Sequence, residues 1–368
     1  MRRRSLRGPK AVILFLVGIL IVNCESSNSA LAARLEIAVD GFMADHLVAG
    51  AAVAVIQDGD LVQVAHGVAE VETQQPVAEE TQFRVASVAK MYLSAIALRL
   101  VDQGELVLDE PIGDSVPLPP SLEHAERFTL RQLLSHTTGL SQTFTADEDR
   151  GRLLTLEDSM ERIPPPVCAP GECWTYADGN YVIVEALLEA TTGKSIAEIF
   201  DEQIIGPLDL ANTAVINPFT SNEPLPAQYA LVHDPSTGVP SEPHRLFEQT
   251  LPLTPTLVTT VSDAARFADA LFSGEVLRPA TLETMLDPGV MDELPCRGDF
   301  ACVLEYGLGV LHYDIGGRHL VGHDGGSGAI LVHDLTDHLT FAILSNGGEQ
   351  DLGKFAEVVL ASIDTQAR

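Results

Sequence analysis

The residues of this chain best suited to chemistry are a serine and a lysine three positions apart, Ser87 and Lys90. On a helix, positions i and i+3 share one face, so the amine of the lysine would lie beside the hydroxyl of the serine. A serine needs such a neighbour to become a nucleophile. The other lysines, Lys10, Lys194 and Lys354, have no serine at this spacing. Because Ser-x-x-Lys is a short pattern that chance produces easily, a surface lysine on an ordinary helix remains the alternative.

Three further segments place polar side chains among apolar residues and glycines. They are Leu133–Leu140 with His136, Pro170–Tyr181 with Tyr176 and Asp178, and Val321–Gly328 with His323, Gly325 and Gly326. Each segment alone is weak evidence. A lone tyrosine, for example, is usually a core residue whose hydroxyl is hydrogen-bonded. Their order along the chain is far more specific than any one of them.

Together with Ser87 and Lys90, these segments resemble the serine β-lactamase and penicillin-binding-protein superfamily. The likeness is strongest to class C β-lactamases, D-alanyl-D-alanine carboxypeptidases and related esterases. It runs from about Leu35 to Ile363, nearly the whole chain after its N-terminal segment. The resemblance implies hydrolysis through an acyl-enzyme, with no metal and no organic cofactor.

The resemblance also assigns roles around the serine. Ser87, at a helix N-terminus, would attack a carbonyl, and the helix dipole would favour the developing negative charge. Lys90 would hold the proton balance of the site, and in a dry pocket its pKa could fall far enough for it to accept a proton. Tyr176 matches the tyrosine of the family's Tyr-x-Asn motif and could instead deprotonate Ser87. Which of the two is the base stays open.

The third segment resembles the family motif in which lysine or histidine precedes x-Gly on a sheet-edge strand. His323 would contact a substrate carboxylate or support Tyr176. Gly325 would let the backbone approach the substrate closely. The amide of Gly326, with that of Ser87, is the candidate oxyanion hole. His136, in the first of the three segments, is predicted to be structural.

Asp178 departs from the family pattern, which has asparagine at this position. An ionised aspartate only accepts hydrogen bonds, whereas asparagine both donates and accepts. Its carboxylate would pair with Lys90, hold it charged and disfavour substrates with a carboxylate nearby. This departure leaves room for an esterase, for amine-bearing substrates or for an inactive relative.

The elements that must position these residues can be read from apolar runs and turn signals. Ala49–Ala65 contains an Asp-Gly turn between two apolar runs and predicts a β-hairpin. Val85–Asp102 predicts a mostly buried helix that ends at Gly104. Further runs predict a helix over Val182–Ala190, strands over Tyr306–Leu311, Ala329–His333 and Leu339–Ser345, and a final helix over Phe355–Ile363.

Strands at both ends with helices between them predict an α/β fold of the α+β type. Its antiparallel sheet would be built from both termini and flanked by helices, with an inserted, mainly helical lobe. Within a hydrolase domain over 33–366, we expect an α/β lobe from 33–115 and 255–366 and a helical lobe over 116–254. The active cleft would lie between the lobes.

Residues 1–24 are expected to lie outside this domain. Four arginines and Lys10 precede a twelve-residue apolar run, Ala11–Val22, which is short for a membrane span and suits an export signal. Cys24 follows the run, as a lipid-modified cysteine would. Cleavage, lipidation at Cys24 and an uncleaved membrane anchor therefore remain alternatives. In each case the domain is exported, to a periplasmic or extracellular location.

The other cysteines suit an oxidising compartment. Cys168 lies near Cys173 and Cys296 near Cys302, so two local disulfides are the simplest of three pairings. No C-x-x-C pattern or nearby histidine pair supports a zinc site instead. The formal charge of −30 disfavours binding to nucleic acid or anionic lipid.

The sequence thus predicts an exported serine hydrolase of amide or ester bonds in a small molecule or peptide. D-alanyl-D-alanine carboxypeptidase-like or β-lactamase-like activity is the first expectation. The alternatives are an esterase of the same fold and a non-catalytic protein that binds penicillin or peptides.

Overall fold

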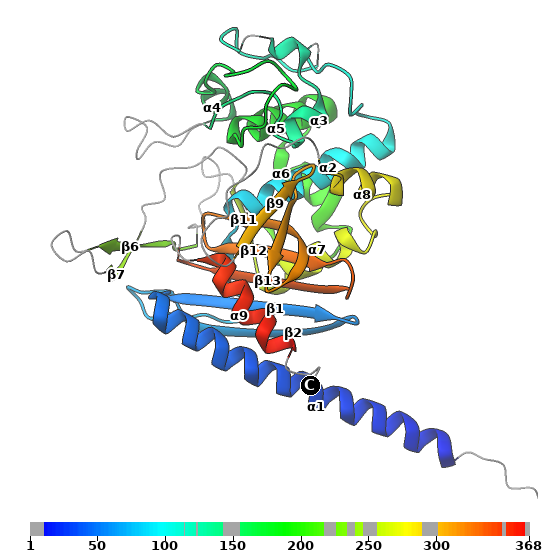
Figure 1. Cartoon of the computed structure of the whole chain (residues 1–368), viewed down its shortest axis with the longest axis vertical. Helices are drawn as coiled ribbons and strands as arrows, with labels where there is room; N and C mark the ends of the chain where they lie inside the picture. Colours follow the sequence, from blue (N-terminus) through cyan, green and yellow to red (C-terminus); the bar gives the residue numbers. More distant parts are fainter. Residues whose placement is uncertain are drawn as a thin grey trace, which may run out of the picture.

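A computed structural model describes residues 11–113, 115–122, 124–142, 155–216, 226–233, 240–245, 256–288, 301–347 and 351–364. Its main feature is an eight-stranded antiparallel sheet in the order β3-β2-β1-β13-β12-β11-β10-β9 (Figure 1). The first three strands are β1 (Gly50–Gln57), β2 (Asp60–Glu70) and β3 (Gln75–Pro76). The others are β9 (Ala301–Tyr306), β10 (Leu311–Ile315), β11 (Arg318–Gly325), β12 (Ala329–Asp334) and β13 (Leu339–Ser345). The predicted sheet from both termini is therefore confirmed.

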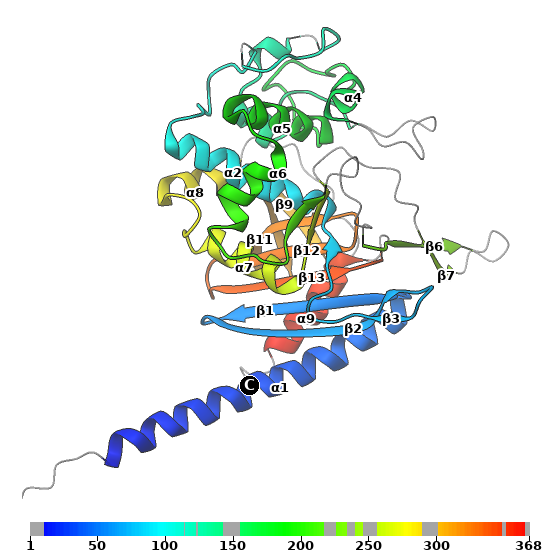
Figure 2. The same ribbon diagram turned by 180° about the vertical axis from the view of Figure 1, so that it is seen from behind.

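The central strand β1 shows how the sheet separates two cores. Side chains alternate between the two faces of a strand. Ala51, Val53 and Val55 accordingly join one buried cluster, whereas the intervening residues of β1 join the other. Helices α1 (Ala11–His46) and α9 (Leu352–Asp364) cover the first face, where the rings of Phe42 and Phe355 stack at 4.0 Å. Figures 1 and 2 show α9 crossing the strands β1 and β2, with its last turns near α1.

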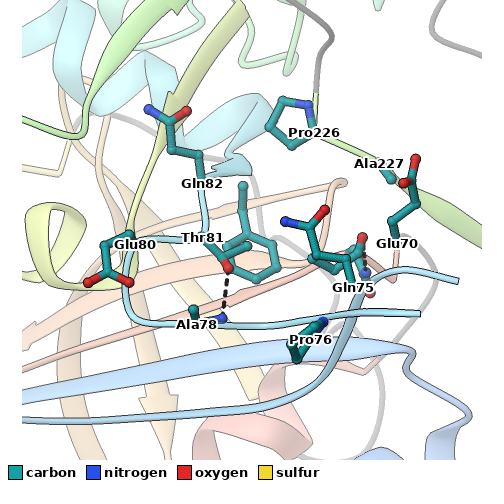
Figure 3. A pocket seen from close by; sticks show the side chains of 12 residues that line it. Glu70, Gln75, Pro76, Ala78, Glu80, Thr81, Gln82, Pro226 and Ala227 are labelled. Carbon is teal, nitrogen blue, oxygen red and sulfur yellow. Dashed lines mark hydrogen bonds between the residues drawn. The ribbon is translucent and has the colours of Figure 1, made fainter. Parts of the chain in front are cut away.

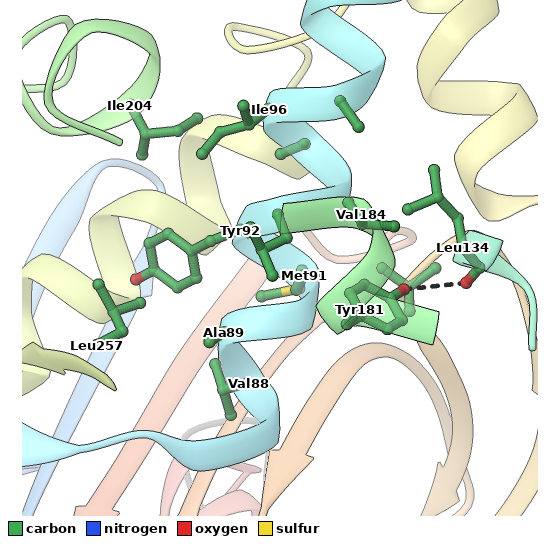
Figure 4. Packing of buried hydrophobic residues seen from close by; sticks show 14 of the residues in the cluster. Val88, Ala89, Met91, Tyr92, Ile96, Leu134, Tyr181, Val184, Ile204 and Leu257 are labelled. Atoms are coloured by element: carbon green, nitrogen blue, oxygen red, sulfur yellow. Dashed lines mark hydrogen bonds between the residues drawn. The ribbon is translucent and has the colours of Figure 1, made fainter. Parts of the chain in front are cut away.

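The second face carries α7 (Val261–Phe272) and, beyond it, α2 (Ala89–Gln103). Helix α2 is buried on nearly all sides, as its continuous apolar run predicts, and it packs against α5 (Asp178–Thr192) (Figure 4). A 3₁₀ turn, η1 (Ala86–Val88), precedes it, so the regular helix begins later than the predicted Val85. Gly104 ends α2 with a left-handed φ of 80°, as predicted.

The remaining elements are short and lie mainly around α2 and α5. The helices are η2 (Ala125–Arg127), α3 (Leu130–Leu134), α4 (Leu156–Glu161), α6 (Ile196–Phe200), the π-helical turn η4 (Asp201–Ile205) and α8 (Pro279–Leu286). The strands β4 (Phe83–Arg84), β8 (Thr256–Thr259) and β5 (Ala214–Ile216) form a small sheet, and β6 (Tyr229–His233) pairs with β7 (Pro240–Arg245).

The predicted β1–β2 hairpin is confirmed. Asp58 and Gly59 connect the strands with φ angles of 53° and 82°. Both residues of a type I′ turn need positive φ, which explains the Asp-Gly pair at this point. The predicted elements over Val182–Ala190, Ala329–His333, Leu339–Ser345 and Phe355–Ile363 are also present, as α5, β12, β13 and α9.

The predicted strand over Tyr306–Leu311 is wrong, because β9 ends at Tyr306 and β10 begins at Leu311. Between them, the amide of Gly307 donates to the carbonyl of Val310 at 2.8 Å. Gly309 has a φ of 80°, and a Cβ there would lie 2.0 Å from the hydroxyl of Ser94. The apolar run therefore holds a tight turn pressed onto α2.

The N-terminal helix α1 begins at Ala11 and runs unbroken to His46, and its first part extends beyond the sheet (Figure 2). From Leu31 onward one face of the helix is buried against the sheet and α9, through Leu31, Leu35, Val39, Phe42 and Met43, whereas Ile37 is exposed. Within the ranges that the structure describes, none of the helices combines the length and apolar character of a membrane span. The side chain of Cys24 lies outside the described residues.

Candidate active site

Ser87 lies in η1, directly before the buried helix α2. Its hydroxyl is 2.9 Å from the ammonium of Lys90, which is fully buried. The Ser-x-x-Lys pattern thus brings the two groups together on one turn, as predicted. Because Lys90 is buried against Ser87, the alternative of an ordinary surface lysine is wrong.

The turn that carries Ser87 is held in a strained conformation. Ala86 has a φ of 45°, in the left-handed region that alanine seldom adopts. Two hydrogen bonds to distant elements fix the residues before it: the amide of Val85 donates to Leu257, and the hydroxyl of Ser327 donates to the carbonyl of Arg84. The surrounding fold therefore determines where the serine points.

Strand β11 approaches this turn through Gly325. A Cβ on Gly325 would lie 2.2 Å from the carbonyl oxygen of Val85 and 3.1 Å from the amide nitrogen of Ser87. Only glycine fits so close to another backbone. A Cβ on the next residue, Gly326, would meet nothing within 4 Å. Gly326 therefore borders open space beside the nucleophile.

The expectation of a sheet-edge strand needs correction, because β11 lies between β10 and β12. However, β10 pairs only with residues 318–322 of β11. His323, Asp324 and Gly325 continue past it and pair with β12 alone. The motif thus has a locally unpaired edge that faces η1. The strand as a whole is an inner one, because β10 and β9 lie beyond β11 in the sheet.

Asp178, the first residue of α5, forms the predicted ion pair with Lys90. The Lys90 Nζ to Asp178 Oδ1 distance is 2.6 Å. Gln142 holds the carboxylate in place: its side-chain amide donates to Asp178 Oδ2 at 2.7 Å, and its Oε1 accepts from the backbone amide of Asp178. Gln142 was not predicted, because no local motif marks it. Both carboxylate oxygens of Asp178 are therefore engaged.

The ion pair controls the charge of Lys90. Burial alone would lower the pKa of Lys90, but Tyr176 and Asp178 outweigh it through charge and hydrogen bonding, and the pKa lies above its ordinary value. This direction argues against the depressed pKa that a dry pocket could give Lys90, and it fits the expectation that Asp178 holds Lys90 charged.

Tyr176 lies beside these groups, with Lys90 Nζ 4.9 Å from the centre of its ring. Burial raises the pKa of the Tyr176 phenol, and the charge of Asp178 adds to this effect. The charge of Lys90 and hydrogen bonds with Lys90 and Ser87 lower it, without offsetting the rise. The structure thus brings Ser87, Lys90 and Tyr176 into one cluster.

His136 supports the segment that carries Tyr176. Its Nδ1 accepts from the backbone amide of Ala177 at 3.2 Å and from the side chain of Asn180 at 3.0 Å. Its ring lies 4.4 Å from that of Tyr176. This fits the predicted structural role. Although His136 is far from Tyr176 in sequence, its contacts hold the segment that carries the tyrosine.

The same two segments run side by side as backbone. The amides of Val167, Gly171 and Thr175 donate to the carbonyls of Gly139, Thr137 and His136, respectively. A disulfide between Cys168 and Cys173 closes the loop directly before Tyr176, as the spacing predicts. The other predicted pair, Cys296 with Cys302, lies outside the residues whose side chains are described.

His323 is buried, and each of its ring nitrogens has a hydrogen-bonding partner. Its Nδ1 lies 2.6 Å from the carbonyl of Asp324, and its Nε2 lies 3.3 Å from the hydroxyl of Tyr306. Tyr306 also contacts His136 Nε2, at 3.2 Å. Sequence reasoning missed Tyr306, because its apolar surroundings read as a strand. Of the two roles considered for His323, this arrangement favours support of Tyr176.

A separate cavity of about 420 Å³ lies beside β2 and β3 (Figure 3). It is lined by the segments 69–83 and 226–227 and by Asn346, and it contains none of the predicted catalytic side chains. In the part of the chain that the structure describes, no group of three or more metal-binding side chains could hold an ion.

Comparison with protein families gives a match over most of the chain. A family model described as Beta-lactamase matches residues 35–362. Among curated proteins, the chain is similar to penicillin-binding protein 4 of Amycolatopsis lactamdurans, with 29% identity over 84% of each chain. It is 31% identical to esterase EstB of Burkholderia gladioli over 53% of each. It is 26% identical to a D-aminopeptidase of Brucella anthropi, over 75% of this chain and 51% of that protein.

The chain thus spans about half the length of the esterase and of the D-aminopeptidase that it matches. Among solved structures, the D-amino acid amidase of Ochrobactrum anthropi has a TM-score of 0.76 at 22% identity, covering 93% of this chain and all of its own. The octameric penicillin-binding-protein homologue of Pyrococcus abyssi has a TM-score of 0.74 at 23% identity, covering 90% and 77%. At these identities the likeness supports the fold.

Proposed function

The chain belongs to the Beta-lactamase family, and from this membership we propose that it is an exported serine hydrolase that forms an acyl-enzyme on Ser87. One observation carries the proposal: Lys90 is fully buried with its ammonium 2.9 Å from the hydroxyl of Ser87. Burying an ammonium is unfavourable unless it is paired, so a lysine placed only for packing would be a poor choice here.

We assign the base to Tyr176, because Asp178 keeps Lys90 protonated. The pKa of the phenol is raised, so Tyr176 holds its proton at rest and the cluster must lose one proton before acylation. The phenolate then takes the proton of the Ser87 hydroxyl while the oxygen of Ser87 bonds to the carbonyl carbon of the substrate. That proton passes to the leaving group as the ester or amide bond breaks, and a water molecule later releases the acyl group.

The negative charge on the substrate oxygen would be met by two backbone amides, those of Ser87 and Gly326. The close approach of β11 at Gly325 supports this assignment, because it brings the residue before Gly326 close to the amide of Ser87. Ala86 and Gly325 thus serve the reaction through backbone geometry.

We propose that the preferred substrates are esters or amides without a free carboxylate beside the bond that breaks. Lys90 is the nearest cation to Ser87 in the described cluster, and Asp178 already neutralises it at 2.6 Å. A substrate carboxylate would therefore meet no free positive charge there. The likeness to an esterase and a D-aminopeptidase supports this substrate class.

A D-alanyl-D-alanine peptidase or β-lactamase is the second candidate. It is favoured by the similarity to penicillin-binding protein 4, which extends over 84% of both chains. We also propose the two lobes given by residues 33–115 with 255–366 and by residues 116–254. Ser87 and Lys90 would come from the first lobe, and Tyr176 and Asp178 from the second. The basic and apolar N-terminal segment, with the Cys168–Cys173 disulfide, supports export.

Labelling with a fluorophosphonate tests the nucleophile. The wild type should be labelled and Ser87→Ala should not, whereas Ser94→Ala, which removes the nearby serine of α2, should keep the label. Turnover of p-nitrophenyl acetate, a D-amino acid p-nitroanilide, nitrocefin and a D-Ala-D-Ala peptide then ranks the substrate classes. We expect the first two to be hydrolysed faster. Wild type that neither reacts nor turns over any of them would instead be a non-catalytic binding protein.

A further inference from the structure

A buried chain of hydrogen bonds joins the two sides of the candidate active site behind the reacting groups. One side is the segment 176–180, which carries Tyr176; the other is the end of β11, which carries Gly325 and Gly326. Tyr306 lies between them, fully buried, with its hydroxyl 3.2 Å from His136 and 3.3 Å from His323.

The partners of the two histidines assign the direction of every proton. His136 Nδ1 receives hydrogen bonds from two N–H groups, those of Ala177 and Asn180, so it carries no proton. Its Nε2 must then carry the proton and donate to the hydroxyl of Tyr306. This agrees with a neutral ring, since burial first, and then the nearby charge of Lys90, lower the pKa of His136 well below its usual value.

At the other end, the carbonyl of Asp324 can only accept, so His323 Nδ1 carries the proton. In the neutral ring that we infer for His323, Nε2 is then an acceptor and receives the proton of the Tyr306 hydroxyl. The neighbouring hydroxyl of Tyr181 also interacts with Tyr306, but its own proton goes to the carbonyl of Leu134 at 2.9 Å and does not compete for His323. With His323 neutral, the bonds from His136 through Tyr306 to His323 run in one direction.

We propose that Tyr306 is a positioning residue for the reaction at Ser87. Its hydroxyl fixes the segment that carries Tyr176 relative to the strand that supplies the Gly326 amide. Acylation needs the phenol and the amide on opposite sides of one carbonyl, and an error of about 1 Å can reduce a rate by about a hundredfold. The proposal rests on the proposed function, because it concerns the same acylation.

Tyr306→Phe tests the role directly, because it removes the hydroxyl and keeps the ring contacts with His136, Trp174 and Tyr176. We expect the maximal rate of Ser87 labelling by a fluorophosphonate to fall about tenfold or more, with little change in the concentration that gives half-maximal rate. Tyr92→Phe is the matched control: it also removes a buried hydroxyl, one without a hydrogen-bond partner in the described structure, and it should keep the rate within about twofold.

A double-variant cycle separates positioning from general destabilisation. If Tyr306 acts through His323, then His323→Leu alone should slow labelling to a similar degree, and the double variant should be little slower than either single variant. If the two reductions in labelling rate multiply in the double variant, the proposal is overturned. A labelling rate of Tyr306→Phe within about twofold of wild type would also overturn it.

The wild type itself provides a readout that does not depend on the variants folding. Imidazole nitrogen NMR should find His136 protonated at Nε2 and His323 at Nδ1, and the opposite tautomers would overturn the chain of bonds. Wild type that is not labelled at Ser87 would reject the proposed function together with this role. Labelled wild type with an unaffected Tyr306→Phe variant would reject this role alone.

Discussion

Asp178 places a full negative charge against the buried ammonium of Lys90, and Gln142 holds that carboxylate from its other oxygen. A pair of this kind is costly to break, because removing one partner leaves an unpaired buried charge. The chemistry proposed for Ser87 therefore takes place next to a fixed ion pair. This gives the pH dependence of acylation a specific origin.

We predict that Asp178→Asn shifts the rise of kcat/KM with pH to lower pH by about one to three units. The carboxylate raises the pKa of both Lys90 and Tyr176, so its loss lowers both. The cluster then loses its proton at a lower pH than in the wild type. A pH profile with p-nitrophenyl acetate measures the shift.

The same substitution also tests the substrate preference. Asparagine leaves the ammonium of Lys90 free to meet a substrate carboxylate, so turnover of a D-Ala-D-Ala peptide or nitrocefin at neutral pH should increase about tenfold or more. Gln142→Asn, which keeps an amide but shortens its reach, is a control that retains the charge of Asp178. An unchanged profile and unchanged substrate ranking in Asp178→Asn would contradict the electrostatic account.

The parts of the site that sequence could predict are those with a residue type unusual for its surroundings. Lys90 inside an apolar run and Asp178 in place of asparagine both stand out. Tyr306 and Gln142 do not, because each acts through a contact that only the folded chain creates. The sequence allows the pKa of Lys90 to move in either direction, and only the folded positions of Tyr176 and of Asp178, at 2.6 Å, favour one of them.

At the level of elements, the approach of β11 to η1 is the contact on which the site depends. We predict that Gly325→Ala destabilises the protein by about 1–3 kcal/mol, since a methyl group would collide with the carbonyl of Val85. Displacement of η1 should also reduce kcat/KM by about a hundredfold. Thermal unfolding and hydrolysis of p-nitrophenyl acetate measure the two effects.

Gly326→Ala is the matched control, one residue further along the same strand end. Its methyl group would meet no atom within 4 Å, and the backbone amide is retained. The midpoint of unfolding should stay close to that of wild type. Equal destabilisation by the two substitutions would contradict the view that close backbone approach at Gly325 is what matters.

The elements that sequence predicted well have local causes. The β1–β2 hairpin follows from the turn at Asp58 and Gly59, and the end of α2 follows from Gly104. The turn over 307–310 was missed because its cause is distant: Gly309 is pressed onto Ser94 of α2. Likewise, β11 lies inside the sheet because β10 and β9 pair beyond it, and these two strands are joined by the same missed turn.

For the whole molecule, the formal charge of −30 predicts a stability that increases with salt. Repulsion among acidic groups opposes the compact state, and ions screen it. We expect the unfolding temperature to increase by several degrees between about 0.05 and about 0.5 M NaCl. Calorimetry measures this shift, and a decrease would show that attractive ion pairs dominate instead.

Arg318→Gln provides a comparison for the salt series. Arg318 binds the carboxylates of Asp334, Asp337 and Asp364 and so ties α9 to the sheet. Without it, three acidic groups repel one another, and the unfolding temperature should fall most at low salt. A loss that is the same at both salt concentrations would show that Arg318 acts through packing rather than charge.

The pairing of the first strands with the last one has a consequence for how the molecule is made. Gly50 and Asn346 are hydrogen-bonded across 296 positions of the chain. Chains dominated by such distant contacts fold slowly, because a long loop must close before the contact forms. During synthesis, the β1–β2 hairpin must therefore wait, with its apolar faces uncovered, until β13 has emerged. A chaperone or a rapid helical collapse around α2 would shorten that exposure, and deletions after β12 should yield insoluble protein rather than a smaller folded one.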